Sequence, residues 1–462
     1  MLSSQLLAAL PTDAVLNGLV AIDPITEGKL TWTPIFIILA KVLIVFVLGL
    51  VGTMLMVWFE RKVVSGMQNR VGPNKAGPFG LLQTLADGIK LFFKEDLLPN
   101  RADRIVFRLA PFLAFVPAFL VWAVIPLGGD FSDGKDGSIT IFGQVTRVQL
   151  ADPPVGILLV LALSGIAVYG IMLAGWASGS KYPLLGAVRA TAQMISYEAA
   201  LGLSLAAVLL SSRTLSTNGI VQTQDRFVDW NIITTGLLPF FVFVVATTAE
   251  LNRPPFDLVE AEQELVGGFN TEYSSIRFAL FFLAEFMNVI TMSGVMVTLF
   301  LGGPQGLFDI PVIPGYIEGS IWFVAKLLLF LYMFVWFRAT LPRLRYDQLM
   351  DFGWKILIPV SLGWFLLLAA LRQFANGDNV VLPRTGSNPK TVQDALTGLK
   401  EMGYEVDLVL VRVPGDEAYR RNIRRFIDTG RLVPPAYVRN VVGDNPTSTY
   451  NTFKSKANRH AE

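Results

Sequence analysis

The chain has 462 residues, of which 53% are hydrophobic and only 16% charged, with a net charge of +2 and a mean hydropathy of +0.52. Soluble domains carry about 25% charged residues, so this composition excludes an ordinary soluble protein and indicates a polytopic membrane protein. The near-neutral charge does not favour nucleic acid, and we expect no such partner. The chain has no cysteine and one histidine, His460. It therefore excludes disulfides, thiolate-held iron–sulfur clusters and cysteine-bound zinc, and we expect no metal site.

The N-terminal segment, 1–34, lacks the basic start of a signal peptide and is interrupted by Pro11 and Asp13. A transmembrane helix needs about 20 mainly apolar residues, and eight later stretches approach or reach that length. They are 35–59, 105–127, 154–177, 185–211, 236–250, 276–301, 321–341 and 356–376. The pattern predicts an all-α polytopic membrane protein with about eight transmembrane helices in a domain that covers 35–376. We find no internal repeat, which argues against an inverted-repeat transporter.

The first link between spans contains the segment 79–94, which reads FGLLQTLADGIKLFFK. Its Phe, Leu and Ile side chains gather mostly on one side of a helix, while Asp87, Lys90 and Lys94 lie on the other. This periodicity predicts a cytoplasmic amphipathic helix that lies along the membrane plane. A surface anchor and a functional element explain the pattern equally well at this stage.

The distribution of lysine and arginine predicts the orientation of the chain, because cytoplasmic links carry the excess of these residues. The links after the first, third, fifth and seventh spans hold thirteen of them, against five in the N-terminal segment and the other links. We therefore expect these four links on the cytoplasmic side and the N-terminus outside. With eight spans, the polar C-terminal extension, 377–462, also lies outside. Lys326, near the end of the seventh span, is interpreted as a side chain that reaches the membrane surface.

Three glutamates lie inside predicted spans: Glu198 near the middle of the fourth, Glu285 well inside the sixth and Glu250 at the end of the fifth. A charge at the bilayer centre costs about 3 kcal/mol on insertion scales, so an ionisable residue there indicates a functional site. Three such carboxyl groups in separate helices favour a path for ions. The structural alternative is that each carboxylate pairs with a nearby arginine or bonds a neighbouring helix.

The fifth link, 250–275, reads ELNRPPFDLVEAEQELVGGFNTEYSS and holds six carboxylates but a single cation, Arg253. Its proline pair prevents a regular helix from running straight through. We expect a new helix to begin near Asp257, with Asp257, Glu260 and Glu264 on one face. Such crowding of like charge indicates a water-filled acidic cavity or a partner that supplies positive charge. The simpler alternative is a solvated acidic loop.

Four stretches make the chain recognisable. They are ERKVVSGMQNRVGPNKAGPFGLLQTLADGIKLFFKED (60–96), SKYPLLGAVRATAQMISYEAAL (180–201), the acidic link (250–275) and RATLPRLRYDQLM (338–350). In this order they resemble the membrane subunit that forms the quinone-binding heel of proton-pumping NADH–quinone oxidoreductase, respiratory complex I. With the eight spans, the resemblance covers about 30–376, and the extension 377–462 does not match it.

The resemblance implies that the chain joins the membrane arm of the complex to its hydrophilic arm and helps to enclose the quinone-reduction cavity. The residues implied to border that cavity are Arg61, Arg70, Asp87, Phe269, Arg338 and Arg343. The carboxylates implied to form a proton path are Glu198, Glu250, Asp257, Glu260, Glu262 and Glu285. Tyr346, Asp347 and Gln348 match a link near the peripheral arm. The amphipathic helix helps to shape the opening through which quinone enters from the lipid.

The implied function is to couple quinone reduction to proton translocation, as an enzyme subunit without a redox cofactor of its own. The substrate is ubiquinone or menaquinone, bound non-covalently, and FMN, NADH and the iron–sulfur clusters belong to partner subunits. The partners are the other membrane and peripheral-arm subunits and the lipid of a bacterial plasma membrane or equivalent energy-coupling membrane. Two alternatives are a membrane subunit of a related membrane-bound hydrogenase or formate hydrogenlyase, and a free-standing proton-coupled carrier.

Overall fold

The computed structural model describes residues 23, 25, 32–131, 135–258, 265–308 and 313–376. The chain divides between Leu368 and Ala369 into two units, and the description below concerns the first. Within the described residues, seven helices are long and apolar enough to cross a membrane, and an eighth apolar helix is shorter. The predicted fold class is confirmed: the chain is a mainly α-helical, multi-pass membrane protein.

Eight helical segments correspond to the predicted spans. They are α4 (Trp32–Met67), α6 (Arg104–Trp122), α7 (Gly156–Ala177), α8 (Lys181–Ser212), α11 (Leu237–Glu250), α13 (Ser275–Phe300), α14 (Gly315–Thr340) and the continuous run of α15 (Tyr346–Asp351), the π-helical turn η5 (Phe352–Leu357) and α16 (Ile358–Asn376). Shorter elements lie in the links: α5 (Gln83–Phe93), α9 (Thr217–Gln222), α10 (Asn231–Thr234), and the 3₁₀ turns η1 (Pro78–Gly80), η3 (Phe227–Asp229) and η4 (Gly268–Asn270).

Local backbone signals set the ends of these helices. Helix α4 runs past the predicted end of the first span and stops just before Asn69, whose φ of 55° turns the chain. The carboxylate of Asp103 caps α6 by accepting from the amides of Ile105 and Val106, at 3.1 Å and 3.2 Å. Gly236, with a φ of 81°, separates α10 from α11. Helix α11 is therefore short, with 14 residues.

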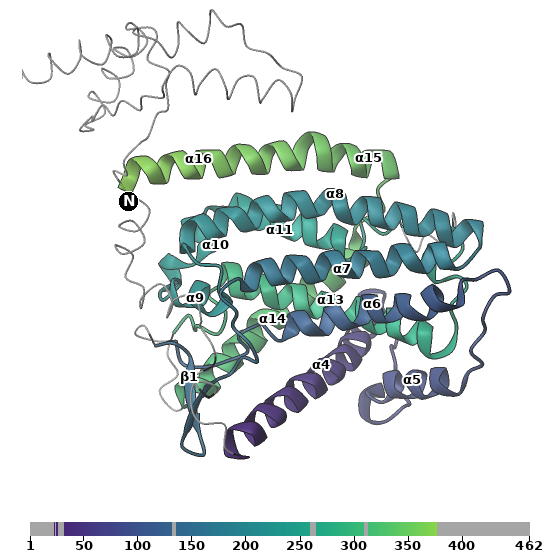
Figure 1. Cartoon of the computed structure of the whole chain (residues 1–462), viewed down its shortest axis with the longest axis horizontal. Helices are drawn as coiled ribbons and strands as arrows, with labels where there is room; N and C mark the ends of the chain where they lie inside the picture. The colour runs from purple at the N-terminus through teal and green to yellow at the C-terminus, as the bar shows by residue number, and fades with distance from the viewer. Residues whose placement is uncertain are drawn as a thin grey trace, which may run out of the picture. The chain divides into compact units, whose positions relative to one another are not determined.

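Helix α13 forms the centre of the bundle. In its most apolar window 72% of the residues are buried, against 11% in α4. It packs against α4, α6, α11 and α14, while α6, α7 and α8 contact one another in sequence. Figure 1 shows these last three as a row of neighbouring helices, with α4 oblique to them. Polar side chains on α13 therefore face other helices rather than lipid.

The predicted amphipathic segment is helical over Gln83–Phe93 (α5), so the helix begins four residues later than predicted. Phe79 and Gly80 have φ values of 53° and 76°, which places Pro78–Gly80 in the separate turn η1. The Trp58 indole nitrogen donates to the Phe79 carbonyl at 3.0 Å and holds this turn against α4. All six apolar side chains predicted to gather on one side are exposed: Phe79, Leu82, Leu85, Ile89, Phe92 and Phe93. The segment thus presents an apolar face away from the bundle core.

The link after α6 contains a short β-hairpin that hydropathy did not predict. Strands β1 (Ser138–Ile141) and β2 (Gln144–Arg147) are antiparallel, with Ser138 opposite Arg147 and Ile141 opposite Gln144. Phe142 and Gly143 join them with φ values of 49° and 77°, the left-handed backbone that a tight two-residue turn requires. Strands of four residues are too short for a readable alternation of polar and apolar positions.

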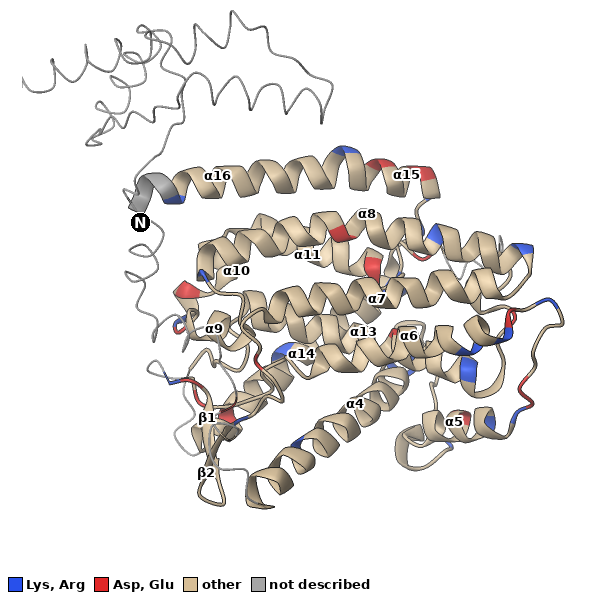
Figure 2. Ribbon diagram, in the orientation of Figure 1, with Lys and Arg blue, Asp and Glu red and all other residues tan. Residues whose placement is uncertain are grey.

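Charged side chains gather at the helix ends and links (Figure 2). We call the end where α4, α7, α11 and α14 finish the basic end, because it carries the links predicted to be cytoplasmic; the other is the opposite end. Hydrogen bonds join the links of the basic end. The Leu344 amide donates to the Pro255 carbonyl at 2.9 Å, and the Leu97 amide donates to Ser274 Oγ at 2.8 Å.

Asp257 and Leu258 are non-helical, and they end the described part of the acidic link before it resumes at Leu265. The Phe256 amide donates to the Arg253 carbonyl at 2.9 Å, and the Leu258 amide donates to the Phe256 carbonyl at 3.0 Å. The helix expected to begin near Asp257 therefore stays a prediction. The segment 259–264, which includes Glu260, Glu262 and Glu264, lies outside the described residues.

Lys326 does not reach the membrane surface but points into the protein at the opposite end, where it is 8% exposed. Its Nζ donates to the carbonyls of Leu301, Gly303 and Gln305, at 2.6 Å, 3.0 Å and 2.5 Å. It also lies 4.3 Å from the centre of the Trp230 ring. The last carbonyls of a helix have no hydrogen-bond partner within the helix. The Lys326 ammonium satisfies three carbonyls that come just after the end of α13.

Candidate functional site

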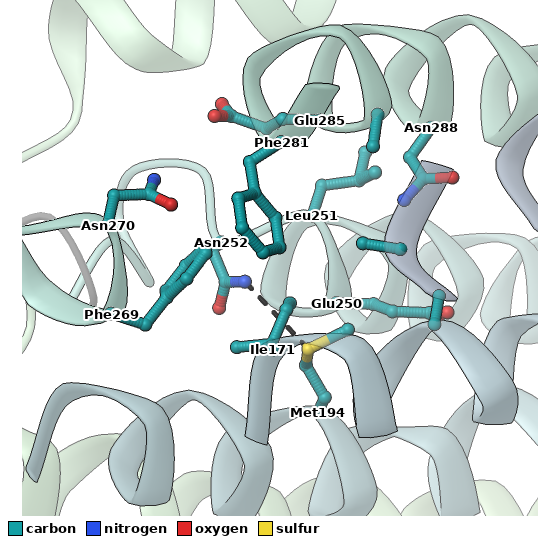
Figure 3. Close-up of a pocket in the computed structure, with 13 residues that line it drawn as sticks. Ile171, Met194, Glu250, Leu251, Asn252, Phe269, Asn270, Phe281, Glu285 and Asn288 are labelled. Atoms are coloured by element: carbon teal, nitrogen blue, oxygen red, sulfur yellow. Dashed lines mark hydrogen bonds between the residues drawn. The ribbon is translucent and has the colours of Figure 1, made fainter. Parts of the chain in front are cut away.

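A polar cavity lies among α6, α7, α8, α11 and α13, and we call it the acidic cavity. It holds about 60 Å³, enough for a few water molecules. Its polar lining comprises Glu250, Asn252, Asn270, Glu285 and Asn288, and Phe269 and Phe281 are among the apolar residues. In Figure 3, Glu250 and Glu285 lie on different sides of the cavity, and the Phe281 ring projects into the space between them.

Glu250, the last residue of α11, lies deep in the helical bundle. Ser164 of α7 donates a short hydrogen bond to its Oε1, and in the described part of the chain Oε2 is buried without a hydrogen-bond partner. Asn270 Oδ1, also on the acidic cavity, is likewise buried without a hydrogen-bond partner among the described residues. Buried polar atoms are normally satisfied by protein or internal water. These two atoms therefore fit a cavity that holds water.

Glu250 also lines a second, smaller and mainly apolar cavity together with Ser164 and Leu201. Glu198 of α8 reaches the same stretch of α7, since its Oε1 lies 3.7 Å from the point where a side chain on Gly165 would begin. Carboxyl groups from two different helices thus approach the same turn of α7, where Ser164 contacts Glu250.

Four charged groups of alternating sign connect the acidic cavity to the basic end, and we call them the charged chain. It begins at Arg338 near the end of α14, which pairs closely with Glu60 of α4. The other oxygen of Glu60 lies 2.9 Å from Arg253 Nη1, and Arg253 Nη2 lies 3.0 Å from Glu285 Oε1. The Arg253 guanidinium also lies 4.6 Å from the centre of the Phe286 ring. The charged chain therefore joins the basic end to Glu285, on the wall of the cavity.

Three of the residues predicted to border a quinone cavity form ion pairs at the basic end. Arg61 of α4 lies 2.8 Å from Asp87 of α5, with both side chains about 40% exposed. Arg343 lies 2.9 Å from Asp257, which joins the seventh link to the fifth. The first pair lies within the first link, and the second joins the fifth link to the seventh.

The remaining residues predicted for the site lie in the first link, on the acidic cavity and in α15. The Arg70 Nε donates to the side-chain oxygen of Gln68 at 2.7 Å in the exposed first link. Phe269 lies on the acidic cavity, where its ring packs edge-on against Phe281 with 5.2 Å between ring centres. In the same link, burial raises the pKa of Tyr273, whose hydroxyl donates to the Phe107 carbonyl at 3.2 Å. Tyr346, Asp347 and Gln348, predicted to face a partner, are exposed in the first turn of α15.

The sequence reasoning missed Glu60, and it noted Arg253 only as the lone cation of the acidic link. Neither residue was assigned to a site, yet both are at the centre of the charged chain. Arg253 and Glu60 are 193 residues apart in the sequence, and Arg338 and Glu60 are 278 residues apart. The usable signal was that one arginine in the acidic link and one glutamate at the end of an apolar run both needed partners.

The chemistry open to this site is proton exchange. In the described ranges, no group of three or more His, Cys, Asp or Glu side chains is placed to hold a metal ion. The carboxyl group of Glu250 contacts a hydroxyl, and that of Glu285 contacts a guanidinium. Carboxyl groups in a small polar cavity take up and release protons according to the charges around them.

The fold and the site together define the class: a mainly helical, multi-pass membrane protein with carboxyl groups on an internal cavity. A family model described as NADH dehydrogenase matches residues 40–369. The chain belongs to this NADH dehydrogenase family, so the resemblance stated from the four motifs is confirmed. The enzyme class predicted from the sequence, a subunit of an NADH–quinone oxidoreductase, agrees with the relatives described next.

Three relatives share one name, which describes the same subunit of NADH-quinone oxidoreductase in each organism. The protein of Frankia alni is 52% identical over 376 residues, covering 80% of this chain and 78% of the relative. That of Frankia casuarinae is 49% identical over 397 residues, covering 84% and 82%. That of Streptomyces avermitilis is 49% identical over 353 residues, covering 74% and 75%. The similarity therefore extends over most of each protein.

Proposed function

We propose that this chain is the membrane subunit of an NADH–quinone oxidoreductase that borders the quinone cavity and couples quinone reduction to proton translocation. Its partners are then the other membrane and peripheral-arm subunits, which hold FMN and the iron–sulfur clusters. The relatives' shared name supports this enzyme over a hydrogenase subunit or a free-standing carrier. The N-terminus lies outside, and the basic end faces the side on which NADH is oxidised.

One observation carries the proton-translocating part of the proposal: carboxyl groups from three helices gather around internal space. Glu250 and Glu285 line the acidic cavity, and Glu198 lies beside Glu250. Keeping ionisable groups at this depth costs about 3 kcal/mol each on insertion scales, which purely structural contacts rarely justify. A few waters in the cavity would connect the carboxyl groups by hydrogen bonds.

Quinone is proposed to react at the basic end, where the arginines predicted for its cavity lie. Arg338 and Arg343 have side chains 42% and 46% exposed, so both are accessible. Reduction passes through anionic forms of the quinone, and guanidinium groups held nearby stabilise such anions. The exposed apolar face of α5 supports an entrance from the lipid, because a lipid-soluble substrate needs an apolar border there.

Glu198→Gln and Glu285→Gln, made separately in the intact complex, test the proton path. Each replacement keeps the shape of the side chain but cannot exchange a proton. We expect coupled proton translocation to fall about a hundredfold, the lower end of the range for loss of a proton-transferring group, while the subunit stays in the complex. Translocation is measured by a pH-sensitive dye in proteoliposomes, beside the rate of NADH oxidation by quinone.

The matched control is Glu95→Gln, an exposed carboxylate at the same end of the protein. It should leave both rates unchanged. Unchanged translocation in both Glu198→Gln and Glu285→Gln would contradict the proposed path, whatever the control shows.

A further inference from the structure

Arg253 holds two carboxylates with one guanidinium. Its Nη1 donates to Glu60 Oε2 at 2.9 Å, and its Nη2 forms an ion pair with Glu285 Oε1 at 3.0 Å, without the geometry of a hydrogen bond. The two terminal nitrogens of the planar guanidinium thus face two carboxylates in two directions, which a lysine ammonium does less well. Arg253 is therefore a counter-ion shared between α4 and α13.

Glu60 is shared in the same way, between Arg253 and Arg338. One of its oxygens faces each guanidinium. The inner pair is buried, with side chains 8% exposed for Glu60 and 5% for Arg253, whereas Arg338 is 42% and Glu285 29% exposed. Charges act on one another more strongly out of water. A change of charge at the exposed end of the charged chain is thus transmitted through its buried middle.

Hydrogen bonds hold the backbone of Arg253 in place, so its side chain is the part of the residue that can move. Its amide donates to the Thr248 carbonyl at 3.2 Å, and its carbonyl accepts from the Phe256 amide at 2.9 Å, which fixes the backbone. The ring of Phe286 lies against the guanidinium and favours positions in which the cation stays over its face. The two carboxylates lie on either side of this position.

We propose that Arg253 is a positioning residue that divides its charge between Glu60 and Glu285 and so transmits the arrival of an anion at Arg338 to the acidic cavity. The inference rests on the proposed function, in which that anion is the reduced quinone. The anion draws Arg338 away from Glu60, and Glu60 then holds Arg253 more strongly. Glu285 loses part of its counter-charge and takes up a proton that the water of the cavity relays from bulk solvent, so no hydroxide is left behind. When the anion is protonated and leaves, Arg253 returns and Glu285 releases that proton to the cavity water as hydronium.

Arg253→Lys in the intact complex tests this inference, because it keeps the positive charge but not the two-sided fork. We expect the complex to assemble, the KM for quinone to stay unchanged, and the protons translocated per electron to fall about twofold or more, in the range of coupling mutations. Glu60→Gln keeps the shape and removes the shared negative charge, and we expect the same loss. Both are measured in proteoliposomes, with NADH oxidation followed in parallel.

Arg277→Lys is the matched control on α13. Arg277 is also largely buried, pairs with one carboxylate, Asp96, at 2.8 Å, and lies 5.5 Å from the Phe107 ring. It shares the chemistry of Arg253 but bridges no pair of carboxylates in the ion pairs described. We expect the proton-to-electron ratio of this variant to equal that of the unmodified enzyme.

The outcomes separate this inference from the proposed function. If Glu285→Gln lowers translocation but Arg253→Lys and Glu60→Gln do not, the proton path stands and the shared counter-ion is wrong. If neither Glu285→Gln nor Glu198→Gln lowers translocation, the proposed path itself is wrong. If both charged-chain variants fail to assemble while Arg277→Lys assembles, the charged chain is structural and the inference is overturned.

Discussion

Two buried cations at opposite ends of the molecule have very different partners. Arg253, 4% exposed near the basic end, faces the carboxylates of Glu60 and Glu285. Lys326, 8% exposed at the opposite end, faces three backbone carbonyls. Both arrangements offset the cost of burying a charge. Only the first uses partners whose own charge can change.

This difference separates partners that can change charge from partners that cannot. A carboxylate that gains a proton attracts its cation less strongly, so the partners of Arg253 can respond to protons. The backbone carbonyls that face Lys326 have no such change, and the lysine joins the turn after α13 to α14. We therefore expect damage at the basic end to alter coupling, and damage at the opposite end to alter stability.

Lys326→Met should have the largest effect on stability. Methionine matches the length of the apolar stem but gives no donor, so three buried carbonyls lose a partner at about 1–3 kcal/mol each. We expect several-fold less assembled complex on native gels. In the complex that does assemble, the protons translocated per electron should be unchanged.

Leu329→Met is the control for this substitution, because Leu329 is 62% exposed on the same helix and its side chain has no donor to lose. It should leave assembly unaffected. Normal amounts of Lys326→Met complex with a reduced proton-to-electron ratio would break the comparison, because they would place Lys326 in the proton path.

Tyr197→Phe should have an intermediate effect, and it sharpens the comparison within one helix. The buried Tyr197 hydroxyl donates to the Leu349 carbonyl at 2.8 Å, which ties α8 to α15. Its loss costs about 1 kcal/mol. We expect hydrogen exchange in 346–357 to become several-fold faster, with coupling unchanged. The neighbouring Glu198→Gln should lower coupling and leave hydrogen exchange in 346–357 unchanged. Equal effects of both variants on coupling would contradict the distinction between structural contacts and contacts that carry protons.

Much of the fold could be predicted from hydropathy, because each span is a local property of about 20 residues. All eight predicted spans correspond to helical segments. Their ends were less accessible, since they depend on single residues such as Asn69, Asp103 and Gly236 that reveal their role only through backbone angles or a cap. The β-hairpin was missed because its strands are four residues long.

The candidate site divides in the same way. Glu198, Glu250 and Glu285 stood out because a carboxylate in an apolar run is conspicuous in the sequence. Their convergence on internal space, and the pairing of Glu60 with Arg253, depend on helix packing between segments far apart in the chain. No periodicity encodes such contacts. The sequence therefore identified charges in unusual places more readily than the partners that balance them.

Asp152 and Asp136, both at the opposite end, should show the smallest effects and differ in sign. Burial raises the pKa of Asp152, although bonds from Ser216 and the charge of Arg147 oppose it. Burial alone would raise the pKa of Asp136 too, but hydrogen bonds from Ser138 and the charge of Arg147 lower it below its ordinary value. Asp152 thus stabilises the link at acid pH and loses that contribution as pH rises. Asp136 stabilises the link above its ordinary pKa and loses that contribution as pH falls.

Hydrogen exchange of 136–155 at matched pH, in Asp152→Asn and Asp136→Asn complexes, measures this difference. As pH rises toward the ordinary aspartate pKa of about 4, the exchange rate of Asp136→Asn relative to the unmodified protein should rise. As pH rises further above that pKa, the relative rate of Asp152→Asn should fall, since each variant removes one pH-dependent contribution. The ratio of protons to electrons should be the same in both variants. A change in that ratio would show that the opposite end also responds to charge, and the distinction between the two ends would then be wrong.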